Sequence, residues 1–237
     1  MSQRAEETVE FAVGERPALV VKNPAGSVTV TAGEPGRVGV QVTKTLRGVM
    51  MGGNGLEAFE RVQVSAEQQN ETIRITVRQP SSSMGGHIVT VALAIQVPAQ
   101  CRLDLEVDAG SVEVNGVSSE ISGRVDAGSL TTRAVTFMER SEARVDAGNI
   151  TIDGALGEGA SLDVRVDAGN ARLTLPQRTD ARLDAQVDAG SITIDGWNVE
   201  RTREFMSARA RGPLIPEARG RLRIKVDAGS IRMQAQH

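Results

Sequence analysis

The sequence predicts an all-β protein, a single-domain parallel β-solenoid (β-helix-like) with about 20 residues and two strands per coil and a loop insertion near the C-terminus. Three observations support this fold. Apolar and polar residues alternate on both sides of a repeated motif, as in strands with one buried face. Aromatic residues make up only 2% of the chain and Tyr is absent, which suits narrow layers of Val, Ile, Leu and Ala. The motif itself, Val-Asp-Ala-Gly, begins at Val107, Val125, Val145, Val166, Val187 and Val226.

Successive motifs begin 18, 20, 21, 21 and 39 residues apart. The last interval therefore contains one coil plus an insertion of about a second coil's length. Identical turns in register favour coils related by translation. The alternative fold is an antiparallel meander of similar hairpins, which the Asp-Gly pairs in the repeats would also suit. The general chirality rule for parallel connections favours a right-handed solenoid.

The single domain, residues 1–237, divides into four parts. We expect irregular strands and loops over 10–100, regular repeats over 101–196, an insertion over 197–220, and the last coil over 221–237. Residues 23–30 contain Asn-Pro-Ala-Gly-Ser where the later repeats have Asp-Ala-Gly-Ser. This degenerate copy indicates that the solenoid begins near residue 23.

The glycines of the motif predict a structural turn in every coil. Gly in the third position of Asp-Ala-Gly-Ser or Asp-Ala-Gly-Asn suits the positive φ of a type II turn, and the preceding carboxylate can accept the backbone N–H two residues later. A residue without Cβ also lets neighbouring coils stack closely. The turn residues are Gly110, Gly128, Gly148, Gly169, Gly190 and Gly229.

The aspartates of the motif form a column along the predicted stack, with neighbouring coils about 4.8 Å apart. Carboxylates at that spacing repel each other, so something must offset their charge. One interpretation is turn hydrogen bonding, helped by a basic residue two positions earlier in four of the six repeats. The other is calcium bound between coils. The candidate ligands are Asp108, Asp126, Asp146, Asp167, Asp188 and Asp227.

The insertion contains the only Trp, an additional aromatic residue, two Pro and five Arg. It predicts a cap or a loop packed across a coil, with Trp197 and Phe205 as anchors, because the end of a solenoid exposes unpaired backbone. A loop that binds a partner is the other interpretation, since Trp among Arg is a common interface hot spot. The residues of this possible partner loop are Trp197, Arg201, Arg203 and Phe205.

No group of catalytic residues is evident, and we expect neither an enzyme nor a bound cofactor. The two histidines, His87 and His237, are too few for a histidine-rich metal site. Cys101 alternates with buried positions and predicts an inert core thiol. Asp163 and Asp184 could supply paired carboxylates for a glycan-active enzyme, but the uniform repeats and scarce aromatic residues argue against one.

Charge and hydropathy limit the partners. The net charge of -3 shows no obvious block of one sign, so we expect no nucleic-acid partner. We also expect no membrane span and no export signal, which would leave the chain as written in the cytoplasm.

The order of these features resembles the bacterial putative-adhesin domain family. An opening strand leads to Asn-Pro-Ala-Gly-Ser-Val-Thr-Val, a middle section ends in Val97-Pro98, and serial V-D-A-G-S/N repeats follow. The resemblance covers roughly residues 10–235 and implies an uncharacterised β-solenoid domain, often associated with the cell envelope.

We therefore expect a non-catalytic scaffold or binding module whose charged sheet surface meets a protein or an envelope polymer. The alternatives are a calcium-dependent, polysaccharide-active enzyme of the β-helix type and a self-assembling structural protein.

Overall fold

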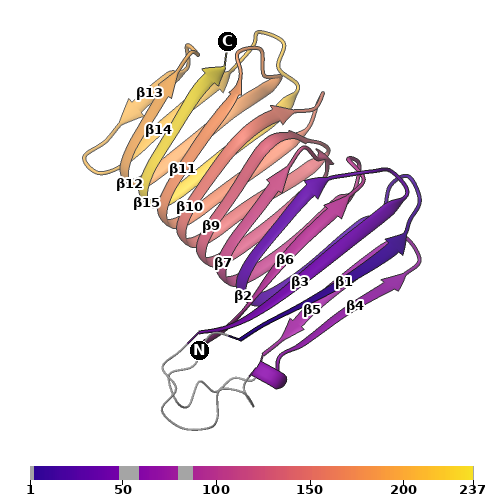
Figure 1. The fold of residues 1–237 in the computed structure, drawn as a ribbon. Helices are drawn as coiled ribbons and strands as arrows, with labels where there is room; N and C mark the ends of the chain where they lie inside the picture. The colour runs from indigo at the N-terminus through magenta and orange to yellow at the C-terminus, as the bar shows by residue number, and fades with distance from the viewer. Residues whose placement is uncertain (1–2, 48–58, 80–87, 237) are drawn as a thin grey trace.

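The computed structural model describes residues 3–47, 59–79 and 88–236, and the structural statements below concern those residues. The chain is all-β, and fifteen strands form one hydrogen-bonded sheet with an open strand order (Figure 1). Within the described ranges, no helix has the length and apolar character needed to cross a membrane. The strands are β1 (Gln3–Ala12), β2 (Ala18–Ala32), β3 (Arg37–Arg47), β4 (Gln63–Gln69), β5 (Thr72–Arg78), β6 (Ile88–Val97), β7 (Arg102–Asn115), β8 (Ser118–Ser119), β9 (Ile121–Phe137), β10 (Arg140–Leu156), β11 (Ser161–Pro176), β12 (Ala181–Asp195), β13 (Glu200–Arg203), β14 (Ala208–Pro213) and β15 (Gly220–Gln236).

Each V-D-A-G motif lies inside one long strand, whereas the sequence predicted two strands separated by a turn. β10, for example, runs through its motif and pairs in parallel with β11 on both sides of it, with Gly148 opposite Gly169. The long strands bend (Figure 1) and the motif glycines have positive φ, yet the Val, Ala and Gly of each motif keep their pairing with the next strand. The bend is therefore compatible with one continuous strand.

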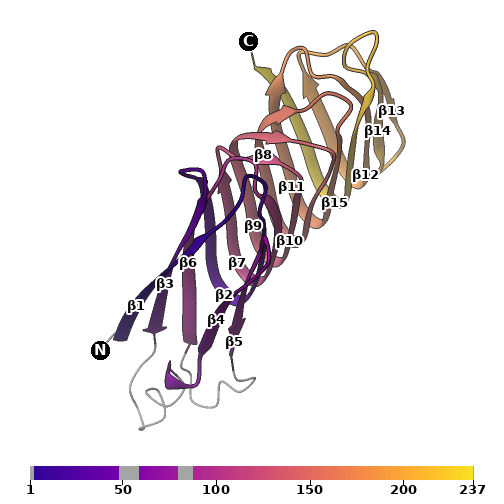
Figure 2. The ribbon, with the colours of Figure 1, turned by 90° about the vertical axis from the view of Figure 1, so that its right-hand side faces the viewer.

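The bends divide each long strand into two arms. We call the residues before the glycine the first arm and those after it the second arm. In Figure 2 the bends of successive strands line up along the stack. Alternate residues of both arms are buried in one core, including Val164 and Val166 on the first arm of β11 and Leu173 and Leu175 on the second. The apolar alternation in the sequence thus encodes the two inner faces.

At the N-terminal end, the degenerate motif pairs in register with the first regular motif. β2 pairs in parallel with β7, and Gly26 lies opposite Gly110. Asn23 occupies the buried Val position and donates a 2.9 Å hydrogen bond from Nδ2 to the Val91 carbonyl. Beyond β2 the arms take different partners: the first pairs with β5, which pairs with β4, and the second continues through β6 and β3 to β1.

The C-terminal repeat does not lie at the end of the stack. β15 runs between β11 and β12 and pairs in parallel with both, and Gly229 lies opposite Gly169 on one side and Gly190 on the other. The spatial order is therefore β11, β15, β12, although β12 precedes β15 in the sequence. Residues 196–219 connect the end of β12 to the start of β15 and allow β15 to lie between β11 and β12.

The predicted loop insertion contains two strands. β13 and β14 form an antiparallel hairpin, and β14 pairs with the first arm of β12. The hairpin adds two strands to this end of the first arm, as Figure 1 shows for the labelled strands. It pairs the first-arm part of the β12 edge that β15 leaves free, which is part of the role expected of a cap.

Candidate functional site

The motif glycines form a column in which each residue packs against backbone. Their φ angles lie between 141° and 148°, beyond the value of about +80° typical of a type II turn. A Cβ on Gly169 would lie 1.7 Å from the Gly148 carbonyl oxygen, and one on Gly229 would lie 1.7 Å from the Gly169 carbonyl oxygen. Close stacking of neighbouring strands therefore requires glycine here, in addition to the backbone angle.

Three of the motif aspartates, Asp126, Asp146 and Asp167, pair with arginines on the outer surface. Arg144 donates from Nε to Asp146 at 2.8 Å and from Nη2 to Asp167 on the next strand at 3.1 Å. Arg124 bridges Asp126 and Asp146 in the same way, at 3.0 Å each. Each of these arginines thus links the aspartate of its own strand to that of the next.

These contacts shift the pKa values in the expected directions. The hydrogen bond from Arg144 lowers the pKa of Asp146, and the charges of Arg144 and Arg124 lower it further. The same hydrogen bond raises the pKa of the Arg144 guanidinium. Both groups are therefore held in their charged forms, and the repulsion between neighbouring carboxylates is offset by the arginines between them.

Asp108 has a different charge environment from Asp146. The position two residues before it holds an acid, Glu106, which pairs with Lys22 at 2.6 Å. Burial is the main cause of a raised pKa at Asp108, and the charges of Asp126 and Glu106 raise it further. The fold thus disfavours the ionised form of Asp108, whereas it favours the ionised form of Asp146.

The calcium interpretation of this column stays a prediction. Among the described residues, no three His, Cys, Asp or Glu side chains converge in a way that could hold a metal ion. At Asp126, Asp146 and Asp167, carboxylate oxygens that could bind a cation accept hydrogen bonds from arginine.

The two aromatic residues of the insertion have opposite environments. Trp197 is 7% exposed, and its indole Nε1 donates a 3.0 Å hydrogen bond to the Gln177 carbonyl. Phe205 is 99% exposed, and Met206 beside it is 60% exposed. Trp197 thus anchors the base of the insertion. Phe205 does not act as an anchor, because the turn between β13 and β14 carries it beyond the apolar core.

The two predicted arginines of the insertion also differ. Arg201 reaches from β13 to the second arm of β12, where its Nη2 donates a 2.6 Å hydrogen bond to the Ile194 carbonyl. It therefore covers part of the open edge of that strand. Arg203 is exposed, and no ion pair joins it to another described residue.

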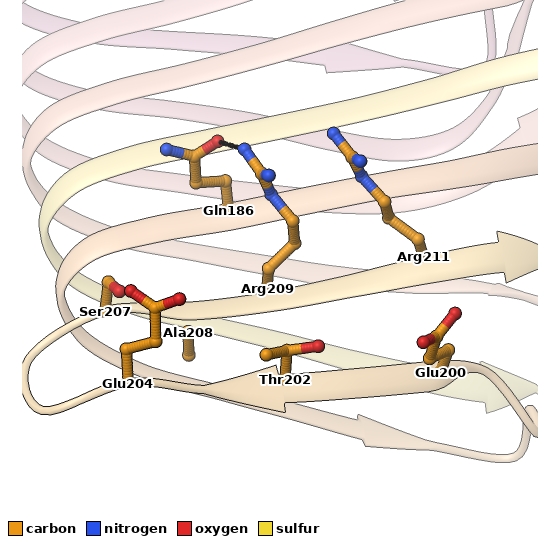
Figure 3. A pocket seen from close by; sticks show the side chains of 8 residues that line it. All are labelled: Gln186, Glu200, Thr202, Glu204, Ser207, Ala208, Arg209 and Arg211. Carbon is orange, nitrogen blue, oxygen red and sulfur yellow. Dashed lines mark hydrogen bonds between the residues drawn. The ribbon is translucent and has the colours of Figure 1, made fainter.

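A groove of about 390 Å³ crosses the outer face of β12, β14 and β13. Figure 3 shows Gln186, Arg209 and Arg211 projecting from this face, and Arg209 donates a hydrogen bond to Gln186. Arg211 binds both oxygens of Asp184, at 2.9 and 3.2 Å, and this contact lowers the pKa of Asp184. The sequence does not indicate this pair, because the hairpin brings together residues that are far apart in the chain.

The remaining chemical candidates are two separated carboxylates, one thiol and two histidines. Asp163 and Asp184 lie on strands separated by β15, and Arg223 lies in register between them. Cys101 is buried, and burial raises the pKa of its thiol to about 12, as expected for an inert core residue. His87 and His237 lie outside the described residues.

Comparison with known proteins identifies the fold. No family model matches the chain, and no curated protein matches it. A solved structure of a putative cell adhesion protein from Clostridium sporogenes is similar with a TM-score of 0.53 and 11% identity, covering 99% of this chain and all of the other. At this identity the likeness shows a shared fold. The resemblance predicted from the sequence is confirmed at that level.

Two further solved structures are similar with lower scores. A putative adhesin from Bacteroides fragilis gives a TM-score of 0.39 at 12% identity, covering 98% of this chain and 97% of the other. A putative adhesin from Parabacteroides distasonis gives 0.34 at 8% identity with the same coverage.

Proposed function

We propose that this chain, which shares its fold with a putative cell adhesion protein, is a non-catalytic β-solenoid binding module associated with the cell envelope. Each coil consists of one V-D-A-G strand, whose two arms meet at the glycine, and its connection to the next coil. The Arg–Asp contacts and the glycine column build a regular scaffold. The C-terminal hairpin then presents a contact surface to a protein or an envelope polymer.

The observation that carries this proposal is the exposure of Phe205 and Met206 at the tip of an otherwise anchored hairpin. Trp197 fixes the base, and β14 pairs with β12 over six residues. Apolar side chains of this size cost free energy when they remain in water. A rigid support with an exposed aromatic tip and arginines nearby has the composition of an interface hot spot.

The charge of the C-terminal segment, which forms the hairpin and β15, indicates the kind of partner. Residues 197–237 contain nine Lys or Arg and four Asp or Glu, whereas residues 1–196 contain eighteen and twenty-six. This corrects the expectation that the chain has no block of one sign. A partner with an acidic surface would be attracted to this end of the stack.

Binding to bacterial cells tests the proposal. Labelled protein is mixed with intact cells or envelope fragments, and the sedimented fraction is measured. Phe205→Ala with Met206→Ala should weaken binding about tenfold, as expected when a hot spot is removed. Met138→Ala is the matched control, because Met138 is 38% exposed and lies away from the hairpin. Equal binding by all three proteins would reject the hairpin as the contact surface.

The enzyme alternative requires carboxylates that are free to act on a substrate, and several of the candidate carboxylates are hydrogen-bonded to arginine. Asp146, Asp167 and Asp184 each accept hydrogen bonds from arginine. We therefore expect the melting temperature to be equal in calcium and in chelator. A rise of several degrees with calcium would support the calcium ladder and reopen the enzyme alternative.

Self-assembly by straight end-to-end stacking is disfavoured, because the two arms extend by different numbers of strands at the two ends. Among the described strands, the first arm extends beyond β12 by β14 and β13, and the second arm ends at β12. At the other end the first arm extends beyond β2 by two strands and the second by three. If β1 of one copy paired with the second arm of β12 of another, β13 and β4 would occupy the same level. Mass measurement by light scattering should accordingly show no concentration-dependent polymers.

A further inference from the structure

Two arginines lie side by side on the outer face of the second arm. Arg172 on β11 and Arg232 on β15 are direct partners in the parallel register, and both are exposed. Thr151 on β10 and Thr193 on β12 lie on either side of them in the same row. In the sequence, the β12 repeat separates these arginines. They become neighbours because β15 runs between β11 and β12.

These two arginines differ from those of the V-D-A-G column in having no carboxylate beside them. Neither Arg172 nor Arg232 forms an ion pair with any residue in the described part of the chain, whereas Arg124, Arg144 and Arg165 all do. Asp153 and Asp195 occur two residues beyond the threonines on their own strands, and no ion pair joins either of them to the arginines.

The arginines line a groove of about 600 Å³ without a carboxylate in its lining. Asn170 donates from Nδ2 to Asn149 at 3.0 Å and accepts from the Ser230 hydroxyl at 2.6 Å, so amide and hydroxyl groups form a row beside the arginines. The other four described grooves contain at least one Asp or Glu in their linings. The groove is therefore positive and rich in neutral hydrogen-bonding groups.

Like charges directly opposite each other on neighbouring strands are destabilising. Between Arg124 and Arg144, the carboxylate of Asp146 accepts hydrogen bonds from both and offsets this repulsion, but the groove of Arg172 and Arg232 has no carboxylate in its lining. An anion bound between the two guanidinium groups would remove it. Guanidinium groups match the planar, two-oxygen geometry of carboxylate and phosphate, and the adjacent amides and hydroxyls suit the hydroxyl groups of a sugar or polyol.

We propose that this groove binds the anionic groups of a polyhydroxylated polymer, with Arg172 and Arg232 holding the carboxylate or phosphate and Asn149, Asn170 and Ser230 contacting its hydroxyl groups. The proposal adds a second contact surface, on the opposite arm from the hairpin, and does not depend on a contact at Phe205. A carboxylated polysaccharide and a phosphate-linked polyol polymer share the required chemistry.

The test measures binding of polygalacturonate, poly(glycerol phosphate) and neutral dextran to the full chain by biolayer interferometry at low and high salt. The double variant Arg172→Ala, Arg232→Ala should lose about tenfold or more in affinity for the anionic polymer that binds, because two charge-assisted contacts are removed. Dextran should bind weakly or not at all, and high salt should weaken anionic binding. The preferred polymer identifies carboxylate or phosphate as the ligand.

The matched control is Arg182→Ala, Arg221→Ala. These arginines are also exposed, are direct partners on neighbouring strands, and form no ion pair within the described residues, but their grooves contain Asp and Glu. The control double variant should bind within about threefold of the unmodified chain, since it changes net charge equally without altering the proposed site.

Equal losses in the two double variants would overturn the proposal, because they would indicate diffuse attraction of a polyanion. Absence of binding to both anionic polymers at low salt would also overturn it. The variant Phe205→Ala, Met206→Ala should bind the polymers normally, so failure of the hairpin contact and failure of this groove are distinguishable. Melting temperatures of all variants show whether each is folded, and the polymer should raise the melting temperature of the unmodified chain only when the groove is intact.

Discussion

Gly169 lies against the backbone of Gly148, so that a Cβ added to Gly169 would come within 1.7 Å of the Gly148 carbonyl oxygen. The same relationship recurs from Gly26 through the six motif glycines. The contact is between two backbones, and neither can move without breaking the parallel pairing on both sides of it.

We predict that Gly169→Ala lowers the free energy of unfolding by about 3 kcal/mol or more, from backbone strain and overpacking together. Urea denaturation measures the change. Gly159→Ala is the control, because Gly159 also has positive φ, 65°, but has no atom within 4 Å of an added Cβ. Similar losses in both variants would contradict the packing argument and leave φ alone as the cause.

Two aspartates at the same motif position should respond oppositely to substitution. The lowered pKa of Asp146 means that its ionised form stabilises the fold above the unfolded pKa of about 3.9, and this stabilisation is lost as pH falls through the lower folded pKa. Asp146→Asn should therefore reduce stability at pH 7, by less than about 1 kcal/mol because the pair is partly exposed. The difference should disappear in acid.

The raised pKa of Asp108 gives the opposite sign. Its contribution is fully present below about pH 3.9 and is lost as pH rises through the folded pKa, so the carboxylate costs stability at pH 7. Asp108→Asn should raise the melting temperature slightly at pH 7 and leave it unchanged at low pH. A lower melting temperature for this variant at pH 7 would contradict the assigned charge environment.

The aromatic residues of the insertion should separate stability from binding. Trp197→Ala removes a buried ring and its hydrogen bond to Gln177, and we expect a loss of about 3–5 kcal/mol by chemical denaturation. Phe205→Ala should change stability by less than about 0.5 kcal/mol, since an exposed side chain loses no packing. A large loss from Phe205→Ala would show that the hairpin tip packs against the protein in solution.

β15 should be among the most protected elements in hydrogen exchange. Its backbone pairs with β11 on one side and β12 on the other, so its amides open only when the centre of the stack opens. Mass spectrometry should find peptides covering residues 221–233 as protected as those of β10, and peptides covering β13 much less so. Rapid exchange in β15 would indicate that it occupies its position only part of the time.

Much of the fold could be predicted from the sequence because each repeat contains the residues that determine its own buried faces and bend. Val and Ile at alternate positions specify the buried faces, and the glycine specifies the level of every bend, including Gly26 in the degenerate copy. The basic residue two positions before the aspartate, as at Arg144, was also visible in the alignment of repeats. These features depend only on residues close together in the sequence, so they can be recognised whatever the order of the strands in the sheet.

The position of β15 could not be predicted in the same way. All repeats carry the same motif, so β15 and β12 are about equally good partners for β11, and only the path of residues 196–219 decides between them. The placement of Arg172 beside Arg232 follows from that order of strands and could not be predicted either. Trp197 is buried and Phe205 is exposed because of where the hairpin turns. The composition of the insertion does not specify the position of that turn.

The position of β15 also affects how this protein is made. During synthesis, β12, β13 and β14 leave the ribosome before β15 does, at a time when the place between β11 and β12 is still empty. The stack therefore cannot be completed one repeat after another in the order of translation. Until β15 has been made, the edges of β11 and β12 that pair with it lack their native partner, and unpaired strand edges can pair with other extended chains.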